Sequence, residues 1–197
     1  MVIKNWKKEI FTIPNMLSLF RLALIPLYIS LYLSARDATD YYVAAAILAV
    51  SCLTDLIDGQ IARRFNMIST VGKVLDPFAD KVTQFTLVVC LAIRYQIVTL
   101  WVLMGLIFVK EIFQLVAGII NYNKGRMLKG AQISGKICTT ILFISLILLV
   151  MLPDIGNTAV VWITVVDIVF LLIAFADYAL VYLKKDSKFQ VLDDQTK

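Results

Sequence analysis

Four aspartates lie close together in a sequence that is otherwise strongly apolar. Asp55 and Asp58 are three residues apart, and Asp76 and Asp80 are four residues apart. On an α-helix, either spacing places the two side chains on one face. Four carboxylates held close together repel one another, so a bound cation or proton must compensate their charge. Carboxylate oxygens are hard ligands that suit Mg²⁺ or Mn²⁺, and the cluster predicts a site for two such ions that serves phosphate chemistry.

Small and basic residues continue the same stretch. Gly59 and Ala62 follow the first aspartate pair by about one helical turn, where they leave room for a bulky or flat ligand. Close helix packing is the alternative reason for a glycine at position 59. Arg63 and Lys73 are the nearby cations, and they could pair with phosphates or with the acids.

Other metal and redox sites find little support in the composition. The sequence has no histidine, which excludes histidine catalysis and histidine metal ligation. Cys52, Cys90 and Cys138 each lie in or beside an apolar run, and none belongs to a CxxC pair. We expect them to be small buried hydrophobic residues.

The elements that must position the acids are membrane helices. Hydrophobic residues make up 60% of the 197 residues and charged residues 17%, whereas about 25% charged residues is usual for a soluble domain. The apolar residues fall into six segments of about 20 residues or slightly more, the length that crosses a bilayer as an α-helix. The predicted fold is therefore an all-α membrane protein with six transmembrane helices, at residues 14–35, 41–64, 74–95, 98–122, 131–152 and 158–183.

The two ends of the chain differ from these segments. Residues 1–12 alternate apolar and lysine positions, which predicts a short amphipathic juxtamembrane helix in the membrane interface; a frayed basic tail is the alternative. The first apolar run is interrupted by Arg21 and Pro26 and has no clear cleavage site, so we expect a retained span rather than a signal peptide. Residues 185–197 are predicted to form a cytoplasmic tail, and the whole chain, 1–197, a single domain.

The basic residues predict how the chain is oriented. The formal net charge is +5, and basic residues gather at the N-terminus, in alternate connections and in the tail. By the positive-inside rule, both termini and the aspartate stretch face the cytoplasm. Nucleic acid is not an expected partner, because the bases are scattered between apolar runs. The residues behind this prediction are Lys4, Lys7, Lys8, Arg63, Arg64, Lys73, Lys124, Arg126, Lys129, Lys184, Lys185 and Lys188.

The aspartate stretch resembles the full motif of the CDP-alcohol phosphatidyltransferases. With its spacing it reads Asp55-x2-Asp58-Gly59-x2-Ala62-Arg63-x8-Gly72-x3-Asp76-x3-Asp80. "TIPNMLSLFR" looks like the opening of the first helix in bacterial members. "GKVLDPFADK" looks like the version found in phosphatidylglycerophosphate synthases and CMP-forming cardiolipin synthases. The resemblance thus implies an enzyme of a bacterial cell membrane with its active site on the cytoplasmic side.

The resemblance also implies a reaction and a role for each motif residue. An acceptor hydroxyl would attack the lipid-side phosphorus of CDP-diacylglycerol, and CMP would leave. Asp55, Asp58 and Asp76 would bind the metal ions, and Asp80 would act as a ligand or as the general base. The CDP pocket would comprise Asp58, Gly59, Ala62, Arg63 and Gly72. A homodimer is expected on the same ground alone.

The acceptor alcohol is predicted less directly. An anionic acceptor needs cations, and five basic residues are candidates: Lys81, Lys110, Arg126, Lys129 and Lys136. Glycerol 3-phosphate, giving phosphatidylglycerophosphate, is the first expectation. Phosphatidylglycerophosphate synthases usually have two basic residues two apart before a threonine at the start of the fifth helix; here Lys136 is present and Cys138 replaces the second. Phosphatidylglycerol as acceptor therefore stays open, as does a remote alternative, a cation transporter with Asp167 deeper in the membrane.

Overall fold

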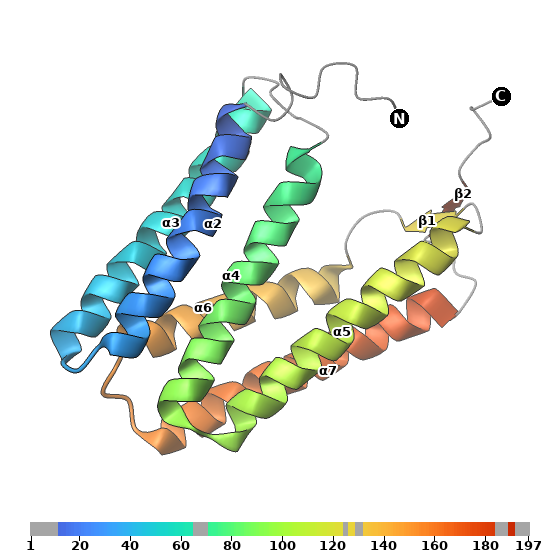
Figure 1. Ribbon diagram of the computed structural model, residues 1–197. Coiled ribbons are helices and arrows are strands. Elements are labelled where there is room, and N and C mark those ends of the chain that lie inside the picture. The colour runs from blue at the N-terminus through green and yellow to red at the C-terminus, as the bar shows by residue number, and fades with distance from the viewer. Residues whose placement is uncertain (1–11, 65–70, 124–125, 129–131, 184–188, 192–197) are drawn as a thin grey trace. The chain divides into compact units, whose positions relative to one another are not determined.

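The computed structural model describes residues 12–64, 71–123, 126–128, 132–183 and 189–191 (Figure 1). These residues form six α-helices and two three-residue strands. The helices agree with the predicted segments to within three residues at either end, and the all-α prediction is confirmed. The elements are α2 (Ile13–Ser34), α3 (Ala38–Arg64), α4 (Gly72–Tyr95), α5 (Val98–Asn123), β1 (Arg126–Leu128), α6 (Ile133–Met151), α7 (Asn157–Leu183) and β2 (Phe189–Val191).

Four helices are long and apolar enough to cross a bilayer, so the chain is an integral membrane protein. These are the segments Asn15–Ser34, Val98–Asn123, Ile133–Met151 and Asn157–Tyr182. Helices α3 and α4 do not reach the same apolar content, because they carry the four aspartates and several bases. Six membrane spans therefore remain a prediction for these two helices.

The predicted juxtamembrane helix over 1–12 lies outside the described residues, apart from Thr12. Thr12 is extended and immediately precedes α2, whose first turn contains Pro14. Helix α3 begins after a connection that Asp40 stabilises, since its carboxylate accepts hydrogen bonds from the backbone N–H groups of Arg36 (3.0 Å) and Asp37 (3.4 Å). An acidic side chain in this position satisfies donors that the helix leaves unpaired.

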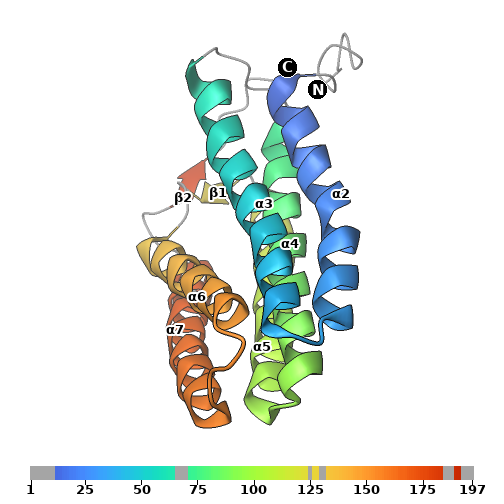
Figure 2. The ribbon, with the colours of Figure 1, turned by 90° about the vertical axis from the view of Figure 1, so that its left-hand side faces the viewer.

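The chain divides into two compact units. One comprises residues 1–94 and 149–154, and the other residues 95–148 and 155–197. In the first unit, α2, α3 and α4 run beside one another (Figure 2). The single-domain organisation expected from the sequence stays a prediction.

An aromatic cluster holds the first unit together at the end where α2 stops and α3 starts. The rings of Tyr28 and Tyr32 stack with their centroids 5.5 Å apart, and Tyr41 of α3 meets Tyr32 edge-on at 5.3 Å. The guanidinium carbon of Arg94 lies 3.6 Å from the centroid of the Tyr41 ring, and the same side chain donates a hydrogen bond of 2.7 Å to the Pro153 carbonyl. Arg94 thus links α3, α4 and the loop after α6.

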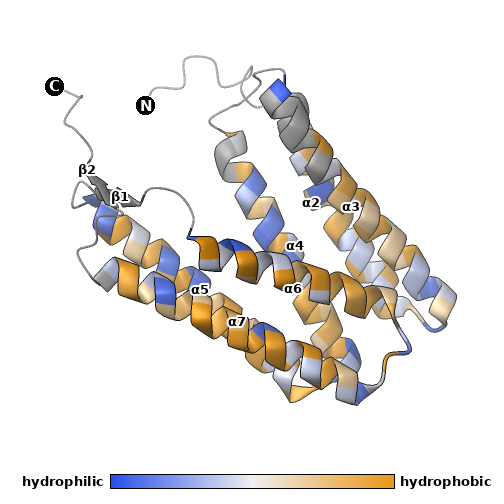
Figure 3. Cartoon of the chain, turned by 180° about the vertical axis from the view of Figure 1, so that it is seen from behind, coloured by the Kyte–Doolittle hydropathy of each residue, from blue (hydrophilic) through white to orange (hydrophobic). Residues whose placement is uncertain are grey.

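The second unit is built from α5, α6 and α7, whose residues are largely hydrophobic (Figure 3). Hydroxyl groups pair across its helices: Thr99 of α5 with Thr164 of α7 at 2.7 Å, and Ser145 of α6 with Asp167 of α7 at 2.9 Å. Such contacts are typical of helices that associate inside a membrane, where burial of apolar surface alone gives no preference for a partner.

A short antiparallel strand pair, which the sequence did not predict, also belongs to the second unit. Strand β1 lies between α5 and α6, and β2 lies in the predicted tail after α7. Arg126 is opposite Val191 and Leu128 is opposite Phe189. The part of the predicted tail over 189–191 is therefore ordered against the preceding loop, and the remaining residues of 185–197 lie outside the described ranges.

Candidate functional site

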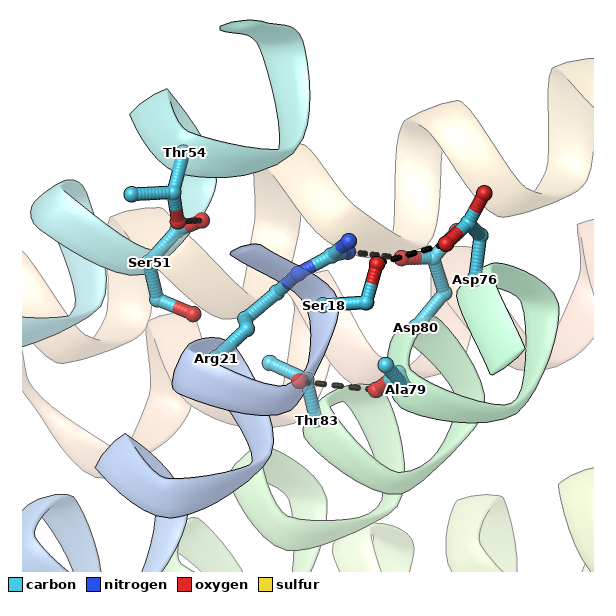
Figure 4. A network of polar contacts seen from close by, with 8 residues as sticks. All are labelled: Ser18, Arg21, Ser51, Thr54, Asp76, Ala79, Asp80 and Thr83. Carbon is cyan, nitrogen blue, oxygen red and sulfur yellow. Dashed lines mark hydrogen bonds and ion pairs between the residues drawn. The ribbon is translucent and has the colours of Figure 1, made fainter. Parts of the chain in front are cut away.

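Helix α4 presents the second aspartate pair toward α2. Asp76 and Asp80 are one turn apart on α4, so their carboxylates share a face as predicted. Ser18 Oγ of α2 donates a hydrogen bond of 2.5 Å to Asp76 Oδ1, and Arg21 Nη1 forms an ion pair with Asp80 Oδ1. Figure 4 shows the two α2 side chains pointing at the two carboxylates. The contacting residues are 58 and 59 positions apart in the sequence. Helices α2 and α4 thus meet at the predicted site.

The ion pair is buried on one side and open on the other. The side chain of Arg21 is 3% exposed, whereas that of Asp80 is 46% exposed. The carboxylate of Asp80 is thus accessible from outside the protein while Arg21 holds it in place. An accessible, hydrogen-bonded carboxylate can accept a proton from a hydroxyl group or bind a cation.

Ser18 and Arg21 are the functional candidates that sequence reasoning missed. The sequence pattern marked Arg21 as an interruption of the first apolar run and as part of the stretch TIPNMLSLFR, and it assigned neither residue a role in the site. The available signal was the spacing of Asn15, Ser18 and Arg21, which recur every three residues and therefore share a helix face. A polar stripe of this kind in an otherwise apolar membrane helix indicates a protein-facing or functional surface.

The first aspartate pair lies on helical backbone, as predicted. Helix α3 continues to Arg64, so the i, i+3 spacing of Asp55 and Asp58 is a helical spacing. The side chains from the first half of the motif, Asp55, Asp58, Gly59, Ala62 and Arg63, lie outside the described residues. Gly72 is buried and opens α4. Convergence of the two aspartate pairs therefore remains a prediction.

The described donors fit a hard divalent cation. Asp76 and Asp80 supply oxygen only, they lie one turn apart, and Asp80 is accessible. Among the side chains that the structure describes, no group of three or more metal-ligating residues occurs. The two carboxylates of α4 would thus supply half of the predicted four-aspartate set.

A cleft lies deeper in the same unit. It begins about one turn beyond the Arg21–Asp80 pair and is mostly apolar, with a serine and two threonines among its lining residues. Helices α2, α3 and α4 all contribute to it, so α2 and the two helices that carry the motif come together here. The lining residues are Leu24, Ile25, Tyr28, Ile47, Leu48, Ser51, Thr83, Thr86 and Leu87.

The candidate acceptor residues differ in accessibility. Lys81 on α4 and Lys136 in the first turn of α6 are exposed. Lys110 is buried on α5, and its Nζ lies 3.0 Å from Glu111 Oε1 in an ion pair. Lys110 therefore has an ion-pair partner on its own helix. The backbone of Arg126 lies in β1 while its side chain is outside the described set, as is the whole of Lys129.

The acids of the last helix have structural partners. Asp167 is 2% exposed and accepts the hydrogen bond from Ser145, and Asp177 accepts one of 2.5 Å from Ser134 at the start of α6. Both contacts join α6 to α7, so these acids contribute to helix pairing in the second unit.

Comparison with known proteins bears directly on this site. A sequence profile of the CDP-alcohol phosphatidyltransferase family matches residues 11–175. The chain is 39% identical over 119 residues to a probable CMP-forming cardiolipin synthase of Drosophila melanogaster, covering 60% of this chain and 35% of that protein. It is 36% identical over 116 residues to the CMP-forming cardiolipin synthase of Streptomyces coelicolor, covering 57% of this chain and 53% of that protein.

A third relative carries a different name. The CDP-diacylglycerol–glycerol-3-phosphate 3-phosphatidyltransferase of Escherichia coli strain K12 is 42% identical over 72 residues, which is 36% of this chain and 39% of that protein. The chain thus spans about half or less of the length of the curated relatives it matches.

Proposed function

The chain belongs to the CDP-alcohol phosphatidyltransferase family, and from this premise we propose that it transfers a phosphatidyl group from CDP-diacylglycerol to an alcohol, releasing CMP. The observation that carries the proposal is the pair Asp76 and Asp80 on one accessible face of α4, held by Ser18 and Arg21. Both aspartates stand at the positions that complete the family motif.

In this reaction the acceptor hydroxyl oxygen forms a bond to the lipid-side phosphorus while the bond from that phosphorus to the oxygen of CMP breaks. Asp80 takes the hydroxyl proton as general base, a role that its exposed carboxylate permits. Asp55, Asp58 and Asp76, with Asp80, would hold two divalent cations, Mg²⁺ or Mn²⁺. Bound there, the cations neutralise charge on the diphosphate, which is the main requirement of phosphoryl transfer.

The donor is proposed to lie with its CDP group at the motif and its acyl chains in the bilayer. Gly59, Ala62, Arg63 and Gly72 would form the CDP pocket, with Arg63 at a phosphate. The cleft between α2, α3 and α4 supports this placement, because it is mostly apolar and begins about one helical turn from the ion pair. A lipid entering from the side needs such an apolar surface next to the charged site.

We infer that the acceptor is a glycerol that carries a phosphate and a free primary hydroxyl group. Glycerol 3-phosphate and phosphatidylglycerol share this chemistry. Two observations favour phosphatidylglycerol, and hence CMP-forming cardiolipin synthesis. Lys136 lacks a second basic residue two positions on, and the matches to cardiolipin synthases extend over more of the chain than the match to the glycerol-3-phosphate enzyme.

Among the candidate acceptor residues, Lys81 and Lys136 are better suited than Lys110. Both are exposed, whereas Lys110 is buried against Glu111. Arg126 and Lys129 stay candidates on the loop that β1 begins. We also propose that both termini and the site face the cytoplasm of a bacterial cell membrane, and that the protein forms a homodimer.

The test is CMP release by the purified protein. The full chain is supplied with CDP-diacylglycerol, Mg²⁺ or Mn²⁺, and one acceptor at a time: glycerol 3-phosphate, phosphatidylglycerol, serine or inositol phosphate. CMP release with phosphatidylglycerol alone selects cardiolipin synthesis, and release with glycerol 3-phosphate selects phosphatidylglycerophosphate synthesis. Absence of CMP with every acceptor, together with Mn²⁺ flux in proteoliposomes that lack CDP-lipid, would replace the proposal with a cation transporter.

A further inference from the structure

Helix α2 carries a buried polar stripe that faces the protein. Asn15, Ser18 and Arg21 are 1%, 0% and 2% exposed. On the opposite side of the same turns, Met16 and Phe20 are each 46% exposed. The helix therefore turns its polar side chains inward and its apolar side chains outward, the reverse of a helix in a water-soluble protein.

We propose that α2 is part of the active centre, with Ser18 and Arg21 as positioning residues for the carboxylates of Asp76 and Asp80. The inference rests on the proposed function, because it assigns these aspartates to metal binding and base catalysis. Neither α2 residue belongs to the motif between Asp55 and Asp80.

The register of the two helices supports this role. Ser18 and Arg21 are three residues apart on α2, and their partners Asp76 and Asp80 are four residues apart on α4. These spacings correspond to similar rises of about 4.5 Å and 6 Å along the two helices. Each α2 side chain thus meets its own carboxylate, Ser18 meeting Asp76 and Arg21 meeting Asp80. A hydrogen bond to one oxygen of a carboxylate restricts the rotation of that side chain, and Asp80 is at the same time 46% exposed.

The two partners of the Arg21–Asp80 ion pair are buried to different extents, and helix packing alone does not require a buried arginine here. A buried guanidinium must be paired to offset the loss of its hydration, and an apolar residue would fill the position on α2 without that cost. Its partner Asp80 is nearly half exposed and so stays open to a substrate or cation. Arg21 therefore fixes a carboxylate that remains available for chemistry.

Substitution of a residue that orients a metal-ligating carboxylate changes metal affinity or turnover, although that residue does not contact the ion. Loss of such a partner typically costs about 10- to 100-fold in affinity or activity. We expect Ser18→Ala to weaken Mn²⁺ binding by about that factor, and Arg21→Gln to lower kcat by about that factor with little change in the KM for CDP-diacylglycerol. Ser18→Thr keeps the hydroxyl group and should restore binding.

Two matched controls lie outside the site. Ser145→Ala removes a serine donor to a buried aspartate in the second unit, and Arg94→Lys alters an arginine at the far end of α4. Neither should change Mn²⁺ affinity or the ratio of kcat to KM. A thermal unfolding curve for each variant separates a loss of fold from a loss of positioning.

The experiment measures Mn²⁺ binding by electron paramagnetic resonance on the full-length protein without CDP-lipid, and CMP release with it. Weakened Mn²⁺ binding in Ser18→Ala and rescue in Ser18→Thr would support the inference, and Arg21→Lys should retain more turnover than Arg21→Gln. If Ser18→Ala binds Mn²⁺ like the wild type, or if Arg21→Gln keeps wild-type kcat, the positioning role is wrong. If the wild-type protein releases no CMP, the proposed function is wrong. The Mn²⁺ titration then still decides the role of Ser18.

Discussion

Gly135 of α6 lies directly against the ring of Tyr178 of α7. A Cβ atom added at position 135 would be 2.6 Å from the Tyr178 hydroxyl oxygen and 2.8 Å from its Cε2 atom. Real Cβ atoms do not approach so closely, so a side chain at position 135 would force the Tyr178 ring to move. Small residues at close helix crossings are a general feature of membrane proteins.

Gly135→Ala is therefore expected to destabilise the protein by about 1–3 kcal/mol, the usual cost of overpacking a well-packed contact. The measurement is thermal unfolding in detergent. Gly105→Ala on α5 is the matched control, because nothing lies within 4 Å of its Cβ position, and it should cause no loss. Tyr178→Phe in the Gly135→Ala background should recover part of the stability; equal stability of Gly135→Ala and wild type would contradict the close contact.

The Ser145–Asp167 hydrogen bond gives a second prediction. Asp167 is buried, so loss of its hydroxyl donor leaves a polar group without compensation. Ser145→Ala should lower the free energy of unfolding by about 1–3 kcal/mol. Thr140→Ala is the control, since that exposed hydroxyl group only bonds to a carbonyl of its own helix. Asp167→Asn should retain CMP release. If this variant releases no CMP, Asp167 takes part in the reaction.

A third prediction concerns the metal and the base. Removal of divalent cations with EDTA should abolish CMP release, and added Mg²⁺ or Mn²⁺ should restore it, because the four aspartates then regain compensating charge. Asp80→Asn should lower kcat by about 10²–10⁴-fold, the usual contribution of a general base, while its unfolding curve shows a folded protein. If Asp80→Asn keeps most of the wild-type activity, Asp80 is not the general base.

Arg94 supplies a fourth prediction, at the opposite end of α4. The guanidinium group of Arg94 contacts the Tyr41 ring and donates a hydrogen bond to the Pro153 carbonyl, which gives this residue a structural purpose. Arg94→Gln should cost about 1–3 kcal/mol of stability through loss of the cation–π contact and the hydrogen bond. The KM for CDP-diacylglycerol should stay at its wild-type value, and unchanged unfolding would show that these contacts contribute little.

The helices were predictable because each is a long apolar run with polar residues at its ends. The last segment was predicted over 158–183 and observed over Asn157–Leu183. The strand pair was not predictable, since three residues carry no periodic pattern and the paired residues lie far apart in the sequence, as with Arg126 and Val191, 65 positions apart.

The site was predictable only where its residues lie close together in the sequence. The four aspartates were found from spacing alone, and the i, i+4 pair of Asp76 and Asp80 does share a face of α4. The contact between Arg21 and Asp80 joins residues 59 positions apart, and no local pattern states which helix an isolated arginine will meet. Periodicity could have shown that Arg21 faces the protein, but not that its partner would be Asp80.

The β1–β2 pair has a practical consequence for protein engineering. Because Phe189–Val191 pairs as a strand with Arg126–Leu128, the segment after α7 is part of the fold and should not be removed. A truncation before residue 189 would remove the backbone hydrogen-bond partner of β1, the strand between α5 and α6. Purification tags and fluorescent fusions are therefore best attached beyond Val191, where the strand stays intact.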